Sequence, residues 1–286
     1  MAFPADLTAD FRFECRELDT SRYVYHYTTR DTALQHILSG RKIRLGPLAK
    51  TNDPRETKSW RFGISGELGF SEDKRERTEE IKKLNEIFEM TKIIRGNCKV
   101  LCTSMDDPAY NPGDFHEFKR GFGHSRMWAQ YGEAHTGVCL IFDRVVLDEA
   151  IRRELNGRCT IYDAVVEYSD SATGRQILAE ALDADEIARH GLESAIKRHR
   201  QRNYRIFFFR KSNDWSQEFE CRWIAIGENE EPEFVPIDNA IAGIVVGVDF
   251  PKIYLPTVIP LCSELKIPGV RIGWENGIPS IRERFV

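Results

Sequence analysis

The sequence lacks the features that would tie the chain to a membrane, to secretion or to nucleic acids in general. No stretch of its 286 residues approaches the roughly 18 consecutive apolar residues that a membrane-spanning helix needs. The N-terminus has no basic segment followed by an apolar one, so we expect no signal peptide. A net charge of −4 gives no basic excess for a general nucleic-acid binder, although a local basic groove is compatible with it. We therefore predict a cytoplasmic protein with no membrane partner.

The cysteines give no sign of a disulfide framework. Seven are present, an odd number, and they are widely spread along the chain. Four of them sit in apolar, strand-like runs, where a free thiol behaves as a small buried hydrophobe. The motifs G-x-S-x-G and G-x-x-x-x-G-K-[ST] are missing as well. These absences favour a reducing compartment and exclude serine-elbow hydrolases and P-loop NTPases.

What is present predicts one α+β domain. A chain of this length buries about three quarters of its unfolded surface, so its core needs neither disulfides nor metals. Hydrophobic periodicity predicts strands over 22–28, 42–45, 99–104, 137–142, 159–168, 218–226, 241–248 and, as the last, 270–274. It predicts helices over 32–38, 71–95, 126–131, 147–155 and 174–205, and a loop over 106–123. With no repeat or linker, we expect a single domain over 1–286, with a core over 23–250 and the remaining strands packed on it.

Four places carry polar residues where the pattern predicts a buried face, and His26 is the first. It lies near the end of the first strand, on the same side as Val24 and Thr28. A lone histidine in this position is more often a core residue whose ring bonds a backbone carbonyl than a site residue. Its functional interpretation therefore depends on the other three places.

The second place is Asn52-Asp53-Pro54, with Glu56 two residues further on. The spacing is typical of an Asx turn with an exposed acid, which is the simpler interpretation. The alternative is a loop whose side chains and free N–H groups meet a ligand.

The third place is the helix that contains Trp128 and Tyr131. The two aromatic residues are three positions apart and so share a helix face, just before a turn that begins at Gly132. An aromatic pair at this spacing is more often part of the core. At a helix end beside a cleft, it is also a stacking surface for a nicotinamide or a base.

The fourth place is the late strand over 218–226, and it is the most informative. A period of two puts Glu218, Glu220 and Arg222 on one face, where apolar residues follow them. Two carboxylates and a guanidinium at the mouth of a buried face can orient one carboxylate and shift the proton affinity of the other. A charged strand end in solvent is the simpler alternative.

Together these pieces resemble a known family. The succession H-Y-T, N-D-P-x-E, a C-T-S strand, M-W-x-x-Y-x-x-x-H-x-G-V-C-x-x-F-D and K-x-x-x-W-x-x-E-x-E-x-R is similar to the prokaryotic domain of unknown function 2971 (DUF2971). The resemblance covers roughly residues 23–250. It implies no reaction, because none is assigned to the family.

A more distant resemblance is to the ADP-ribosyltransferase fold, which implies a mixed or antiparallel split sheet with inserted helices. The first strand and helix, H-Y-T followed by A-L-x-x-I-L-x-x-G, also resemble the start of DNA-modifying DarT-type toxins. The resemblance implies the catalytic residues Glu220, Glu218 and His26. It implies a cofactor-binding set of His26, Tyr27, Thr28, Asn52, Trp128, Tyr131 and Arg222. Thr103 and Ser104 are a second candidate, besides Tyr131 and Trp128, for the motif that packs against the nicotinamide. Arg44 or Lys50 are alternatives to Arg222 as the pyrophosphate ligand.

The resemblance implies an NAD-dependent ADP-ribosyltransferase that modifies a nucleic acid or a protein and has NAD as its substrate. A toxin or phage-defence setting, with an antitoxin or defence-system partner, goes with it. The implied chemistry is coherent, because a carboxylate stabilises the oxocarbenium-like state that forms when the nicotinamide–ribose bond breaks.

Three alternatives stay open. The first is a non-catalytic sensor that binds a nucleotide-like ligand in the same place. The second is a metal-dependent hydrolase or nuclease built on Asp114, His116, His124, Glu133 and His135, whose spacings fit no standard zinc pattern, so we expect no metal. The third is an enzyme with Cys102 or Cys139 as its nucleophile and a histidine as the base. No local sequence motif supports it.

Overall fold

The computed structural model describes residues 22–57, 63–65, 82, 85–86, 89, 97–109, 119–170 and 181–286. Its strands are β1 (Tyr23–Thr28), β2 (Lys42–Pro47), β3 (Gly63–Ser65), β4 (Cys98–Ser104), β5 (Val138–Asp143), β6 (Thr160–Val165), β7 (Glu167–Tyr168), β8 (Ala181–Asp183), β9 (Arg210–Lys211), β10 (Glu220–Ile226), β11 (Glu233–Pro236), β12 (Ile241–Val246), β13 (Gly269–Glu275) and β14 (Ile278–Arg284). Its helices are η1 (Thr32–Leu38), η2 (Leu48–Lys50), α1 (Pro54–Thr57), α3 (Ser125–Gln130), α4 (Arg144–Leu155), α6 (Ala184–His190), α7 (Leu192–Phe208), η4 (Asn213–Glu218), η5 (Lys252–Tyr254) and α8 (Leu255–Leu265).

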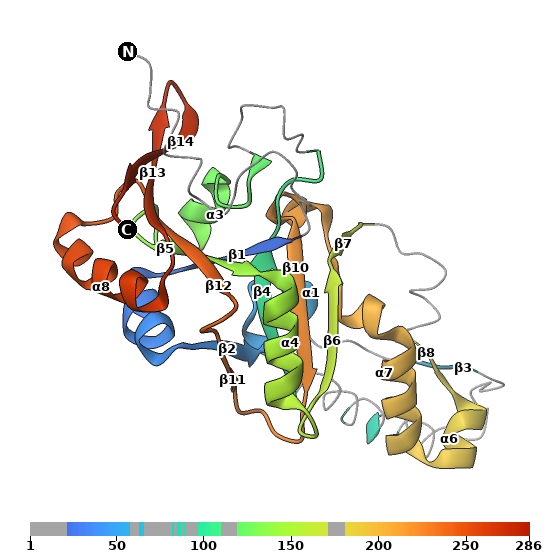
Figure 1. Cartoon of the computed structure of the whole chain (residues 1–286). Coiled ribbons are helices and arrows are strands. Elements are labelled where there is room, and N and C mark those ends of the chain that lie inside the picture. The colour runs from blue at the N-terminus through green and yellow to red at the C-terminus, as the bar shows by residue number, and fades with distance from the viewer. Residues whose placement is uncertain are drawn as a thin grey trace.

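One large, mostly antiparallel sheet organises these elements (Figure 1). Its strands follow the order β11-β2-β4-β1-β5-β12-β13-β14, and β10 and β6 extend it from the other edge of β4. β12 and β13 pair in parallel, with α8 in the connection between them. The predicted α+β class with a mixed sheet and inserted helices is therefore confirmed.

Helices cover both faces of this sheet. On one face α4, η1 and α8 pack onto a core that includes Val24, Leu140 and Trp223. On the other face α3 packs against Tyr25 and Tyr27, and α7 packs against Ile224. The apolar residues of β1, β5 and β10 contribute to the cores on both faces of the sheet, since successive side chains of a strand point to opposite faces. No described helix is long and apolar enough to cross a membrane.

The sheet is split along one edge of β4. There β1 pairs with β4 at Ser104, whereas β2 pairs with it at Val100 and Lys99. Cys102 lies between these two pairings. Its carbonyl oxygen lies 3.0 Å from Nδ1 of His26, so a side chain occupies the place of a strand partner.

Several predicted boundaries are corrected. The described part of the helix expected over 174–205, from residue 181 on, is instead β8, α6 and α7, because Gly191 takes a left-handed conformation (φ 77°) and separates the two helices. The strand over 270–274 is not the last, since β14 follows it, and the strand over 159–168 forms two pieces, β6 and β7. Most of the helix expected over 71–95 and residues 110–118 of the loop expected over 106–123 lie outside the described residues; residues 82, 85–86 and 89 are described and are helical.

Candidate functional site

The start of β10 differs from the predicted strand, and the difference builds the site. Residues 213–218 form the 3-10 turn η4 rather than the strand onset. Phe219 then takes a left-handed conformation (φ 46°), and its carbonyl oxygen accepts a bond from Met105 N (2.9 Å). Glu218 therefore approaches β10 from a turn, whereas Glu220 and Arg222 lie two apart on the strand itself. The prediction that all three share one strand face is corrected for Glu218.

Glu220 and Arg222 form a buried bidentate ion pair. Arg222 Nε donates to Glu220 Oε1 (2.8 Å), and Arg222 Nη2 donates to Glu220 Oε2 (2.7 Å). Arg222 Nη1 bonds Glu56 Oε1 and the carbonyl oxygen of Phe208. Arg222 is fully buried, so the pair brings the N-D-P-x-E motif against the late strand. The partners of the Arg222 guanidinium all belong to the protein, and the side chain has no exposed surface. This corrects the expectation that Arg222 holds a pyrophosphate.

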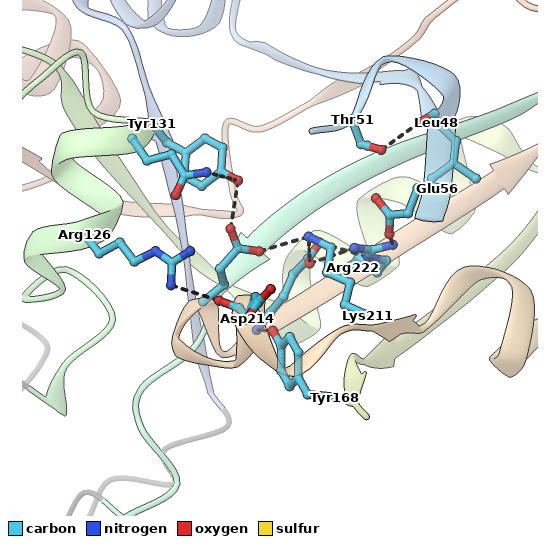
Figure 2. A network of polar contacts seen from close by, with 12 residues as sticks. Leu48, Thr51, Glu56, Arg126, Tyr131, Tyr168, Lys211, Asp214 and Arg222 are labelled. Carbon is cyan, nitrogen blue, oxygen red and sulfur yellow. Dashed lines mark hydrogen bonds and ion pairs between the residues drawn. The ribbon is translucent and has the colours of Figure 1, made fainter. Parts of the chain in front are cut away.

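Lys211 joins the two carboxylates that follow it in sequence (Figure 2). Its Nζ lies 2.9 Å from Glu218 Oε2 and 2.7 Å from Glu220 Oε2. The short strand β9 carries Lys211, which is buried along with both partners. The backbone N–H of Glu220 donates to the Tyr168 hydroxyl (2.8 Å), so β7 also borders the cluster.

Tyr131 connects this charged cluster to the surface. Its hydroxyl donates to Glu218 Oε1 (2.8 Å) and accepts from Gln130 Nε2 (3.3 Å). The side chain of Asn52 lies near the same phenol and acts to lower its pKa. Tyr131 is half-buried and Asn52 is exposed. Arg126, exposed on α3, donates to the carbonyl oxygen of Asp214 (2.9 Å) on the same side (Figure 2). We call Asn52, Tyr131 and Glu218 the Glu218 corner.

The charges of the cluster are fixed at neutral pH. Burial raises the pKa of Glu220, but Arg222 and Lys211 outweigh it and bring the pKa to about 2. Burial lowers the pKa of Lys211, but the Glu220 carboxylate, with Cys102 and Glu56, raises this pKa above its ordinary value. Burial, with the nearby Glu218 carboxylate, raises the pKa of the Tyr131 phenol. Glu220 is therefore an anchored anion and is unsuited to act as a general base.

His26 is not brought into this cluster. Tyr25 is in register with Ser104 and Ser104 with Glu220, so these side chains share one face of the sheet. His26, one residue on, belongs to the other face, in register with Leu140 of the opposite core. Burial lowers its pKa, so the ring is neutral and bonded to the Cys102 carbonyl. The structure thus makes His26 a half-buried histidine whose ring bonds a backbone carbonyl, away from the charged cluster.

The remaining predicted ligand-binding residues belong to the core. Trp128 is fully buried, donates from Nε1 to the Phe122 carbonyl (2.8 Å) and meets the Tyr27 ring edge-on (5.0 Å between centroids). Its ring has no open face for a ligand, which corrects the stacking role expected of it. The Tyr27 hydroxyl donates to the Gly121 carbonyl (2.5 Å), and Thr28 is buried at the end of β1. The Thr103 hydroxyl donates to the Cys221 carbonyl (2.7 Å).

The alternative sites gain no support from the described residues. Within the described part of the chain, no group of three or more His, Cys, Asp or Glu side chains is arranged to hold a metal ion. Asp114 and His116 lie outside it. Burial raises the pKa of both the Cys102 and the Cys139 thiol, which opposes formation of a nucleophilic thiolate.

The sequence patterns missed two residues of the cluster. Lys211 is the first letter of the K-x-x-x-W motif, so the motif contained a signal that periodicity alone did not show. Tyr168 had no signal, because a tyrosine near the end of a predicted strand is an ordinary core residue.

Comparison with protein families adds one finding. Residues 127–223 match the model of the family described as "Protein of unknown function (DUF2971)". The predicted resemblance to this family is confirmed over that segment, which contains Tyr131, Lys211, Glu218, Glu220 and Arg222. Comparisons with curated proteins and with solved structures gave no match.

Proposed function

We propose that the Glu218 corner is the active centre of an enzyme that transfers ADP-ribose from NAD to a macromolecule, a nucleic acid or a protein. One observation carries this proposal. Glu218 is the carboxylate of the buried cluster that also bonds a half-buried tyrosine, Tyr131, near the exposed Asn52. Segments near residues 52, 131 and 218 therefore meet where a buried carboxylate lies directly behind a half-buried aromatic ring.

The geometry suits cleavage of an N-glycosidic bond. The bond between nicotinamide N1 and ribose C1′ breaks, and its electron pair leaves with the nicotinamide. The positive charge that develops on the ribose is stabilised by the nearby Glu218 carboxylate. The acceptor then bonds to C1′, and its proton passes to Glu218.

The other residues of the cluster position this carboxylate. Lys211 bonds one Glu218 oxygen (2.9 Å) and Tyr131 bonds the other (2.8 Å), which fixes the orientation of the carboxylate. Glu220, which Arg222 fixes, holds Lys211 in place from the buried side. The Tyr131 ring is the surface against which the nicotinamide packs, and we assign the exposed Arg126 of the same helix to the phosphates.

A second candidate function is a sensor that binds a nucleotide-like ligand without turning it over. Both oxygens of Glu220 are taken by Arg222 and Lys211, and its pKa of about 2 leaves it no proton to exchange near neutral pH. A rigid charge network of this kind also suits a binding site.

The experiment incubates the purified full chain with NAD labelled in the adenosine part, in the presence of DNA, RNA or protein. Nicotinamide release and transfer of the label are measured for the wild type and for Glu218→Gln. We expect Glu218→Gln to lower nicotinamide release by about 10²-fold or more, because it removes the charge that the transition state needs, with little change in NAD affinity. The control Glu193→Gln removes an exposed carboxylate of α7 and should act as the wild type does.

The outcomes separate the two candidates. A loss of affinity without any turnover by the wild type supports the sensor. Wild-type protein that neither releases nicotinamide nor labels any acceptor overturns the transferase.

A further inference from the structure

Trp215 is the uncharged member of the K-x-x-x-W-x-x-E-x-E-x-R succession, whose other residues belong to the charged cluster. It lies in the 3-10 turn η4, and its backbone N–H donates to the carbonyl oxygen of Ser212 (3.1 Å). This turn leads from Lys211 at its start to Glu218 at its end, so the chain carries an indole ring between two charged groups that bond each other.

The Trp215 ring lies against the ammonium group of Lys211. Lys211 Nζ is 5.2 Å from the centroid of the ring, which is within the range of a cation–π interaction. An ammonium group has three N–H donors, and the carboxylates of Glu218 and Glu220 take up two of them (2.9 and 2.7 Å). Among the described residues, the face of the Trp215 ring is what remains for the third.

The same ring reaches the boundary of the charged cluster. Trp215 is half-buried, whereas Lys211 is buried. The Cζ atom of Arg126 lies 5.9 Å from the centroid of the Trp215 ring, and Arg126 is exposed and bonded to the carbonyl oxygen of Asp214 (2.9 Å). Trp215 therefore contacts one buried cation and one exposed cation.

We propose that Trp215 is a positioning residue of the active centre, whose ring keeps water from the Lys211 ammonium and so keeps Lys211 directed at Glu218. Water at this ammonium group would compete for its N–H donors and weaken its ion pairs, because the attraction between charges falls as the local dielectric constant rises. Glu218 would then lose one of the two bonds that orient it. The expected effect on catalysis rests on the proposed function, whereas the expected effect on Lys211 does not.

The first measurement is the rate at which an amine-acetylating reagent modifies Lys211 in the full chain, followed by peptide mass spectrometry and expressed relative to the exposed Lys197. We expect Trp215→Leu to raise this rate about tenfold or more, because leucine has no π-face and leaves the ammonium group open to water. Trp215→Phe should restore most of the protection, since it keeps an aromatic face. Trp274→Leu, which changes another half-buried tryptophan on β13, is the control and should leave the rate at its wild-type value.

The second measurement is nicotinamide release from NAD by the same folded variants. We expect Trp215→Leu to lower kcat about tenfold with a smaller change in KM, because a misoriented Glu218 carboxylate affects the transition state more than substrate binding. Trp215→Phe should recover most of kcat.

The two measurements fail separately. A rate of Lys211 acetylation that Trp215→Leu leaves unchanged overturns the inference, whatever the wild type does with NAD. Equal rates in the leucine and phenylalanine variants overturn it as well, since the aromatic face would then be irrelevant. If the wild type releases no nicotinamide but the acetylation rates follow the expected order, the proposed function fails and the protection of Lys211 by Trp215 is supported.

Discussion

Arg222 has no exposed surface, yet it carries a positive charge in the interior of the sheet. Its partners Glu220 and Glu56 and the Phe208 carbonyl replace the water that it loses on burial. A buried ion pair adds little net stability, but removing one partner leaves the other charge buried and unpaired. The arrangement is therefore stable only while all its members are present.

This property gives a prediction for Arg222→Met. We expect it to lower the free energy of unfolding by about 3–5 kcal/mol, because Glu220 and Glu56 lose their shared cation. Urea denaturation followed by circular dichroism measures the change. Arg282→Met, which breaks a surface pair with Glu275, should cost no more than about 1 kcal/mol. Equal and small losses in the two variants would contradict the assigned network.

His124 predicts a pH dependence of stability. Both its ring nitrogens are buried and have no hydrogen-bond partner among the described residues, and its ring packs against Phe219. Burial lowers its pKa to about 4 from 6.5. The unfolded chain therefore binds a proton that the folded chain does not, so stability falls as the pH falls from about 6.5 towards 4 and levels off below that.

The measurement compares melting temperatures of the wild type and His124→Phe between pH 7 and pH 4. Phenylalanine keeps the ring contact and removes the titrating group, so the variant should lose less stability on acidification. Parallel curves for the two proteins would show that His124 does not contribute.

At the scale of elements, the turn over 133–135 depends on a glycine that lies far away in sequence. Gly247→Ala would set a methyl group against the His135 carbonyl, which is backbone and cannot rotate away. We expect a loss of about 1–3 kcal/mol in the free energy of unfolding. Gly40→Ala is the control, because nothing lies within 4 Å of its added methyl group. If the two alanine variants are equally stable, the turn is not held by this contact.

Sequence patterns predicted the elements that repeat a simple period. β1, β5 and β12 are apolar strands. The helix predicted over 147–155 begins earlier, at Arg144, because Asp143 accepts bonds from Val145 N and Val146 N (3.1 and 3.2 Å). The patterns could not predict the left-handed Phe219, because a strand of period two continues through it on paper. That one residue moves Glu218 off the strand and into the turn where it meets Tyr131.

The sequence also predicted only part of the candidate site. Glu218, Glu220 and Tyr131 could be identified as polar residues in buried positions. Periodicity could not identify Lys211, because a lysine beside a turn is ordinarily exposed and its burial depends on two carboxylates from other elements. His26 and Trp128 have the residue types of a ligand site. The His26 ring instead bonds the Cys102 carbonyl of β4, and Trp128 packs against Tyr27 in the core.

At the scale of the whole molecule, one apolar core links early and late parts of the chain. The cluster on the α4 face contains Val24 and Leu38 from the start of the described chain and Cys262 and Ile267 from near its end. We therefore expect a single cooperative transition in differential scanning calorimetry, with equal calorimetric and van't Hoff enthalpies. Two separate transitions would show that the part after β12 folds independently.

The charged cluster also bears on how the chain reaches this fold. Glu56 and Arg222, which meet in the cluster, are 166 positions apart in sequence. Until the intervening strands have assembled, these charges stay in water, and a contact of such sequence separation forms slowly. The ion pairs at the base of the Glu218 corner are therefore among the last native contacts to form, so a partly folded chain has no site.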